Sequence, residues 1–140
     1  MRKGQLAVEF LAVLAVLMLL FVVLMRQAAE RQSQADAALV RASAAAALEA
    51  VAGSINAAVL AGNGSSAILL PPATLITGVG YELELHGESR LLEARWPLDV
   101  PRKERSRLQV PLITGAFSGS LPLPGENGTA DYAEGVVRLG

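Results

Sequence analysis

Arg-Lys-Gly-Gln-Leu-Ala-Val-Glu-Phe, residues 2–10, opens the longest apolar stretch of this chain. The sixteen residues from Phe10 to Met25 carry no charge. Together with residues 6–8 they are long enough to cross a bilayer as a helix, which needs about 20 residues. Glu9 lies at the start of this stretch, and burying a carboxylate costs about 2.5–3.5 kcal/mol at the centre of a membrane and less near its surface. The sequence therefore predicts a membrane-spanning helix with a carboxylate whose burial some partner must offset.

Residues 3–10 resemble the class III signal peptide of archaeal type IV pilin-like proteins, the superfamily that includes the archaellins. The resemblance implies that a prepilin peptidase cuts between Gly4 and Gln5, with Lys3 as the basic residue before the cut. Gln5 then becomes the new N-terminus, and its amine pairs with Glu9 of a neighbouring subunit. The expected function is that of a structural subunit, a major or minor pilin, which self-associates into a filament with the help of a pilus assembly platform.

Three further classes of protein begin with a comparable apolar stretch. A secretory signal peptide has a short apolar region followed by small residues at its cleavage site, which Ala28-Ala29 supply weakly, with Arg26 intervening. A plain single-span anchor for a surface binding module accounts for the length but gives no role to Glu9. Bacterial TadE-like pseudopilins share a similar Gly-x-x-x-Val-Glu-Phe start. We favour the archaeal pilin-like interpretation, because it uses both the junction at Gly4 and the glutamate.

Composition and charge limit the other functional classes. The chain has 140 residues, 52% of them hydrophobic, a net charge of −1 and no cysteine. A near-neutral charge argues against nucleic acid as a partner, and without cysteine there is no disulfide or thiolate chemistry. Basic residues are more frequent before the apolar stretch (Arg2 and Lys3) than directly after it (Arg26), which favours a cytoplasmic N-terminus and an extracellular C-terminus. We expect a single-pass protein of the cell membrane, in contact with its lipid, that becomes part of a cell-surface filament after processing.

The predicted fold class is α+β, a long N-terminal helix packed on a small antiparallel β-sheet domain as in pilins. No proline interrupts residues 5–61, and Gly53 is the only glycine between Gln5 and Ala61. Apolar residues at positions 40, 44, 48, 51, 55 and 59 form one stripe, and Gly62-Asn63-Gly64 predicts the end of the helix. The expected organisation is a leader (1–4), a transmembrane or filament-core helix (5–25), an Ala-rich amphipathic helix (26–61), a linker (62–72) and an exported β domain (73–140).

Alternation of apolar and polar residues predicts strands in the C-terminal half. Residues 79–86 alternate in this way, and His86-Gly87-Glu88-Ser89 predicts a hairpin turn. The next inward row is Leu92, Ala94, Trp96, Leu98 and Val100, and residues 107–112 and 136–139 supply two further strands. A β domain of this size is marginal alone, so we expect it to pack on the helix stripe.

Nothing in the sequence points to an enzyme, a cofactor or a metal site. His86 is the only histidine, and we expect it on the polar face of a strand or in its solvent-exposed turn rather than as a general base, with Glu82 and Glu84 on a solvated face. Residues 126–131 hold oxygen ligands around a glycine but lack the EF-hand spacing, so a turn is expected rather than a calcium site. The basic cluster 102–107 is expected to be a solvated loop, or else a contact to an acidic surface, and it lacks the aromatic residues of a nucleic-acid site.

Two N-glycosylation sequons occur in turn-like contexts, at Asn63 and Asn127. The chain has three asparagines, and Asn56 is the one outside a sequon. Asn-Gly is also a favoured turn pair, which accounts for half of each motif. Because archaeal pilin-like proteins are often glycosylated, the resemblance implies that at least one of the two sites carries a glycan.

Overall fold

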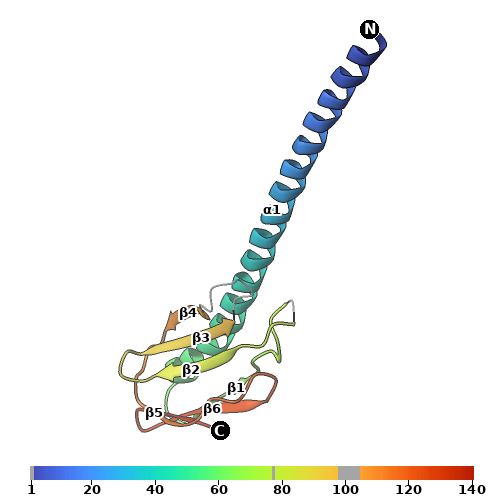
Figure 1. The fold of residues 1–140 in the computed structure, drawn as a ribbon. Helices are drawn as coiled ribbons and strands as arrows, with labels where there is room; N and C mark the ends of the chain where they lie inside the picture. Colours follow the sequence, from blue (N-terminus) through green and yellow to red (C-terminus); the bar gives the residue numbers. More distant parts are fainter. Residues whose placement is uncertain (1, 77, 98–104) are drawn as a thin grey trace. The chain divides into compact units, whose positions relative to one another are not determined.

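The computed structural model of the chain describes residues 2–76, 78–97 and 105–140 (Figure 1). These residues contain one helix and seven strands. Helix α1 spans Arg2–Ala61, and the strands are β1 (Ser65–Leu69), β2 (Glu82–His86), β3 (Leu91–Pro97), β4 (Arg105–Pro111), β5 (Phe117–Gly119), β6 (Gly128–Ala133) and β7 (Val136–Leu139). The α+β fold class is confirmed. The chain divides into two compact units, Met1–Ala38 and Leu39–Gly140.

The first unit is helical throughout its described residues. Its sequence contains neither proline nor glycine after Gly4, so no residue interrupts the hydrogen bonding of α1. The most apolar 18-residue window has a mean hydropathy of 3.0, and none of it is buried within the structure. Because its apolar side chains are exposed, this helix is compatible with single-pass membrane anchoring.

Helix α1 ends at Ala61, where the glycines predict its end. Gly62 and Gly64 have φ angles of +91° and +85°, a left-handed conformation that glycine adopts without the steric cost of a Cβ atom. The backbone N–H of Gly62 donates to the carbonyl of Val59 at 3.2 Å. The hydroxyl of Ser65 donates to the backbone carbonyl of Ala58. This turn leads directly into β1. Residues 62–72, expected as a linker, therefore contain a strand.

The strands of the second unit form two sheets within the described residues. The first has the order β1-β6-β7-β5, and its pairs are antiparallel except for β5 with β7, which is parallel. The second has the order β2-β3-β4 and is antiparallel. The prediction of a single antiparallel sheet is thus corrected to one antiparallel and one mixed sheet.

The β2–β3 hairpin has the register that the alternation predicts. Leu83 pairs with Ala94, Leu85 with Leu92, and Glu84 with Glu93. Because successive side chains of a strand point to opposite faces, the apolar pairs share one face and the two glutamates share the other. The turn between the strands spans residues 87–90, one position later than predicted.

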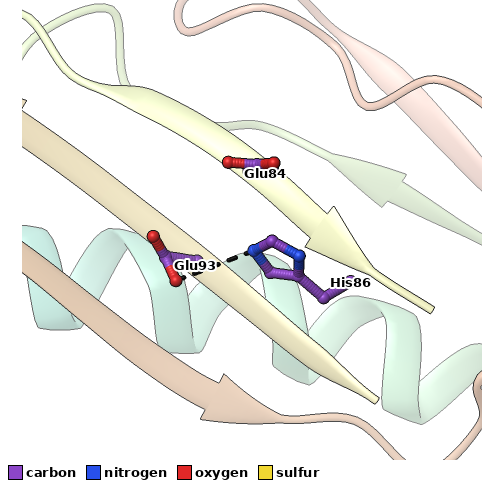
Figure 2. A group of neighbouring side chains, drawn as sticks. All are labelled: Glu84, His86 and Glu93. Atoms are coloured by element: carbon purple, nitrogen blue, oxygen red, sulfur yellow. Dashed lines mark ion pairs between the residues drawn. The ribbon is translucent and has the colours of Figure 1, made fainter. Parts of the chain in front are cut away.

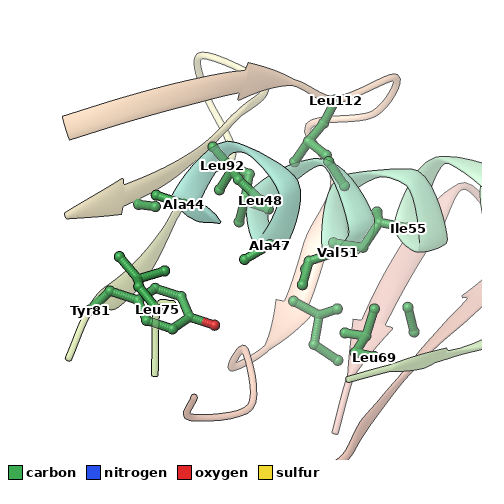
Figure 3. Packing of buried hydrophobic residues seen from close by; sticks show 14 of the residues in the cluster. Ala44, Ala47, Leu48, Val51, Ile55, Leu69, Leu75, Tyr81, Leu92 and Leu112 are labelled. Atoms are coloured by element: carbon green, nitrogen blue, oxygen red, sulfur yellow. The ribbon is translucent and has the colours of Figure 1, made fainter. Parts of the chain in front are cut away.

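One hydrophobic cluster joins the second half of α1 to both sheets (Figure 3). Leu48 and Ile55 are 0% exposed, and the cluster also includes Leu69 of β1, Leu92 of β3 and Val137 of β7. The predicted stripe is confirmed. Its inner members are buried, and its outer members, Val40 and Val59, are partly buried against the cluster. The predicted inward row is confirmed at Leu92, Ala94 and Trp96, whereas Leu98, Val100 and residues 102–104 of the basic cluster lie outside the described residues.

Candidate functional site

The first candidate site lies in the opening turns of α1. The side-chain Nε2 of Gln5 donates a hydrogen bond to Oε1 of Glu9 at 3.4 Å, a contact that the spacing of four on a helix allows. This distance is at the long limit for a hydrogen bond, so the contact compensates little of the charge on Glu9. The flanking side chains of Val8 and Phe10 are 67% and 68% exposed. Glu9 is therefore a carboxylate set in an exposed apolar surface.

The other residues of the predicted processing site are described in less detail. Lys3 and Gly4 belong to α1, which begins at Arg2 rather than at Gln5. The surroundings of these two residues lie outside the described part of the structure. The predicted cut between Gly4 and Gln5 stays a prediction from the sequence.

Both sequon asparagines are exposed. Asn63 lies in the turn after α1, where its Oδ1 accepts a hydrogen bond from the backbone N–H of Glu134 at 2.6 Å. This bond uses the carbonyl oxygen of the side chain and not the amide nitrogen, which is the atom that a glycan would join. Asn127 directly precedes β6, and the hydroxyl of its sequon residue Thr129 lies 3.4 Å from the carbonyl oxygen of Gly140. Exposure of both asparagines is therefore what the structure contributes to the sequon prediction.

The region considered as a turn or a calcium site is partly strand. Glu126 and Asn127 lie before β6, but residues 128–131 belong to that strand. Asp131 pairs there with Arg138 of β7 in the antiparallel register. The oxygen ligands of residues 126–131 are therefore spread along an extended segment and do not form one loop.

A second candidate site, which the sequence does not predict, covers the outer face of the β2–β3–β4 sheet. It consists of five side chains that we call the Glu93 cluster: Glu84, His86, Glu93, Arg95 and Gln109. Glu93 is 1% exposed and is the only buried charged residue among those that the structure describes. The register places Glu84, Glu93 and Gln109 in one row across the three strands. Neighbouring strands thus cover the Glu93 side chain on the polar face of the sheet.

Both carboxylate oxygens of Glu93 accept hydrogen bonds from the cluster. Arg95 donates from Nε to Oε1, and Gln109 donates from Nε2 to Oε2. Arg95 also binds Glu84, with 2.7 Å between Nη1 and Oε2. The hydrogen bond from Gln109, followed by that from Arg95, holds the pKa of Glu93 below its usual value despite the opposing effect of burial. Glu93 is therefore a buried carboxylate that stays ionised at neutral pH.

His86 faces Glu93 from the end of β2 (Figure 2). Its side chain is 32% exposed, and its Nε2 lies 3.6 Å from Oε2 of Glu93. This nitrogen is buried and has no hydrogen-bond partner among the described residues. His86 thus lies on the polar face of the strand, one of the two positions expected for it, but the expectation of a solvent-exposed ring is corrected because its Nε2 is buried. The cross-strand row of Glu84, Glu93 and Gln109 is the signal that could have located this cluster.

A cavity of about 430 Å³ borders the same sheet. Its lining consists of Tyr81, residues 82–84 of β2, Arg95 of β3 and the segment 121–124. Its walls combine charged side chains with the leucines and prolines of Leu-Pro-Leu-Pro. This mixture is typical of a surface depression that could accept a small polar ligand.

Comparison of the chain with known proteins gives no match to a family model, to a curated protein or to a solved structure. Its function is therefore inferred from its own residues and their geometry.

Proposed function

We propose that this protein is a structural subunit of an archaeal type IV pilus-like surface filament, anchored in the membrane by residues 5–25 before assembly. One observation carries the proposal: the start of α1 exposes apolar side chains, whereas Leu39–Gly140 contains a core of its own. Fifteen large apolar side chains between Val8 and Met25 are each at least 41% exposed. Burying each of them is worth about 1.5–3 kcal/mol, so this segment requires an apolar environment outside the chain.

Lipid and a bundle of identical helices meet this requirement about equally well. Lipid tails are as apolar as leucine, so moving the helix from the membrane into a filament changes little hydrophobic free energy. Glu9 is the side chain that distinguishes the two environments. Lipid offers no partner to its carboxylate, whereas a neighbouring subunit offers a charged amine once cleavage after Gly4 exposes the N-terminus of Gln5. Glu9 therefore favours assembly over remaining in lipid.

The same pairing sets the relative position of neighbouring subunits. Within one chain the new amine and Glu9 are separated by one helical turn, about 6 Å along the axis. Between chains they approach more closely, and relative to two separate charges in water the attraction at low dielectric is offset by desolvation of similar size. Relative to water the pair therefore contributes register more than net stability, because a subunit displaced by one turn leaves both charges buried and unpaired.

Glu9→Gln tests this function directly. We expect the variant to enter the membrane and to be cut between Gly4 and Gln5 normally, while the yield of filaments sheared from cells falls sharply. Intact mass and N-terminal sequencing report processing, and electron microscopy of the sheared material reports assembly. The matched control is Glu30→Gln, which removes an exposed carboxylate of the same helix that pairs with Arg26 at 3.9 Å. Normal filaments from fully processed Glu9→Gln would contradict the proposal.

The resemblance also proposes the partners and the modification of this subunit. Its partners are further copies of the chain, the prepilin peptidase, the pilus assembly platform and membrane lipid. Glycosylation is proposed at Asn63 or Asn127, both exposed. The measurement is the intact mass of the mature protein. A mass above that of the bare chain, with the excess lost when both asparagines are replaced by glutamine, would support glycosylation. A mass equal to that of the bare chain would contradict it.

The alternative function is a membrane-anchored surface module that binds a ligand through its β domain. The cavity beside β2 is the observation that favours it, because it brings charged and apolar side chains together on the surface. Such an anchor has no need of the cut after Gly4, and it would function normally with glutamine at position 9. Retention of residues 1–4 in the membrane-bound protein would therefore favour the module over the filament subunit and over a TadE-like pseudopilin.

A further inference from the structure

The three potential metal ligands of the Glu93 cluster lie on one hairpin. Glu84 and His86 are two residues apart on β2 and point to the same face, and Glu93 is directly opposite Glu84 on β3. One ligand atom from each side chain lies within 4.8 Å of the others (Figure 2). We propose that Glu84, His86 and Glu93 bind a divalent metal ion with the ligand preferences of zinc.

The spacing of His86 and Glu93 fits a bridging metal better than a hydrogen bond. Their Nε2 and Oε2 atoms are 3.6 Å apart, beyond the range of about 2.7–3.2 Å for an N–H···O hydrogen bond. Two ligand atoms that are each about 2.1 Å from zinc lie about 3.4 Å apart at the tetrahedral angle and about 3.6 Å apart at 120°. The buried Nε2 has no other partner among the described residues. A cation between the two atoms would satisfy both of them.

The charge of the cluster also favours a cation. Two carboxylates face each other across neighbouring strands, and Arg95 contributes one positive charge that both of them share. With a neutral His86 the group of Glu84, Glu93 and Arg95 keeps a net negative charge. A divalent ion would reverse this excess and relieve the repulsion between the two glutamates.

Arg95 and Gln109 are arranged to support the metal ligands. Arg95 binds Oε1 of Glu93 and Oε2 of Glu84, which leaves Oε2 of Glu93 facing His86. Gln109 donates to that Oε2, and a carboxylate oxygen has lone pairs for both a donor and a metal. Supporting hydrogen bonds of this kind fix the orientation of a ligand and raise its affinity for metal.

Closing the site requires a small movement of one side chain. Glu84 is 48% exposed, so its carboxylate can approach the other two ligands without disturbing the core. Three protein ligands leave a position for water, and His86 and Glu84 are both partly exposed to it. One imidazole nitrogen with two carboxylates suits zinc better than magnesium or calcium, which prefer oxygen ligands throughout.

The test uses the full-length, untagged protein in detergent after removal of metal with a chelator. Calorimetric titration with zinc chloride should show one ion per chain, and Co²⁺ should give the visible absorption of a site with nitrogen and oxygen ligands. Because the chain has one histidine and no cysteine, side-chain nitrogen ligation identifies His86. We expect His86→Gln and Glu84→Gln to weaken binding by at least about tenfold. Glu88→Gln, in the exposed hairpin turn beside the cluster, should bind like the wild type.

The metal-free proteins should have the same far-UV circular dichroism, which excludes misfolding as the cause of lost binding. Glu93→Gln is not used as the main variant, because it changes a buried carboxylate on which the local structure depends. Equal zinc affinity in either His86→Gln or Glu84→Gln, or the absence of one-to-one binding by the wild type, would overturn the proposal. So would His86 ring resonances that respond to pH but not to zinc, because a proton would then occupy the gap. The outcome is independent of whether the chain forms filaments.

Discussion

Replacing Leu48 with alanine removes a side chain that is 0% exposed and lies in the cluster between α1 and the sheets. Leucine-to-alanine substitutions in cores cost about 2.7–5 kcal/mol, because the free energy of the remaining cavity adds to the lost burial. A domain of about 100 residues has a total stability of about 5–15 kcal/mol. A loss of about 3 kcal/mol therefore removes a large fraction of it and lowers Tm by about 12–24 °C.

Leu39→Ala is the matched control for this substitution. It makes the same chemical change in the same helix, but Leu39 is 51% exposed. We expect it to change the free energy of unfolding by no more than about 0.5 kcal/mol. The two substitutions have the same effect on helix propensity, so the difference between them measures burial alone.

The assay is thermal unfolding of a soluble fragment of residues 27–140, followed by circular dichroism. This fragment contains the whole of the second compact unit, and we expect it to be folded and monomeric without the apolar stretch. If Leu48→Ala and Leu39→Ala melt at the same temperature, the stripe is not packed on the sheets of its own chain. Its apolar residues would then face another subunit.

The remaining predictions concern the core, the processing site and the buried carboxylate. Ile55→Asp places an unpaired charge at a residue that is 0% exposed. It should lower the free energy of unfolding of the same fragment, measured in urea, by about 3 kcal/mol or more. An unchanged urea midpoint would contradict the burial of Ile55. Gly4→Leu should leave the uncut precursor in the membrane, because a peptidase that cuts after glycine has no space for a larger side chain; a mature mass starting at Gln5 would contradict the leader assignment. The pKa of Glu93 is lowered in the folded state, so its stabilisation is complete above the unfolded value of about 4.3 and is lost as the pH falls through the lower folded value. Gln109→Leu removes the largest cause of this shift, so its Tm should fall less than that of the wild type between about pH 6 and about pH 2; an equal fall would exclude the hydrogen bond as the cause.

The parts of the fold that follow from local pattern could be predicted from the sequence. The end of α1 depends on Gly62 and Gly64, whose conformations are set within one turn of chain. The buried stripe follows from a helical repeat, and the β2–β3 hairpin follows from alternation on both sides of a short turn. Each of these signals lies within about 20 residues, and no distant part of the chain is needed to interpret it.

The parts that depend on distant contacts could not be predicted. β5 pairs in parallel with β7, and its Gly119 has a φ of +91° at a place where a Cβ atom would clash with the carbonyl oxygen of Leu139. A glycine is required there, but the reason lies twenty residues further along the chain. β1 and β6 are recognisable only as partners of each other, since neither has a clear alternation of its own.

The Glu93 cluster was not predicted for a related reason. A polar residue on the outer face of a single strand is expected to be solvated, and this holds for Glu93, Gln109 and His86 taken one at a time. Burial of Glu93 results from the combined cover of residues from three strands. Only the register of all three strands brings them together. The filament function and the processing site, in contrast, stay predictions from the first residues of the sequence.

The buried carboxylate of β3 also has a consequence for the accuracy of folding. A slip of one residue between neighbouring strands turns the leucines outward, so the hydrophobic core itself rejects that error. A slip of two residues keeps every leucine on the inner face, and the core does not detect it. The slip that puts Pro111 of β4 opposite Glu93 takes Gln109 out of the row. It leaves a buried oxygen without its donor, because proline has no side-chain donor, and this carries a penalty. The polar face of the sheet thus rejects an even-numbered error that the apolar face tolerates.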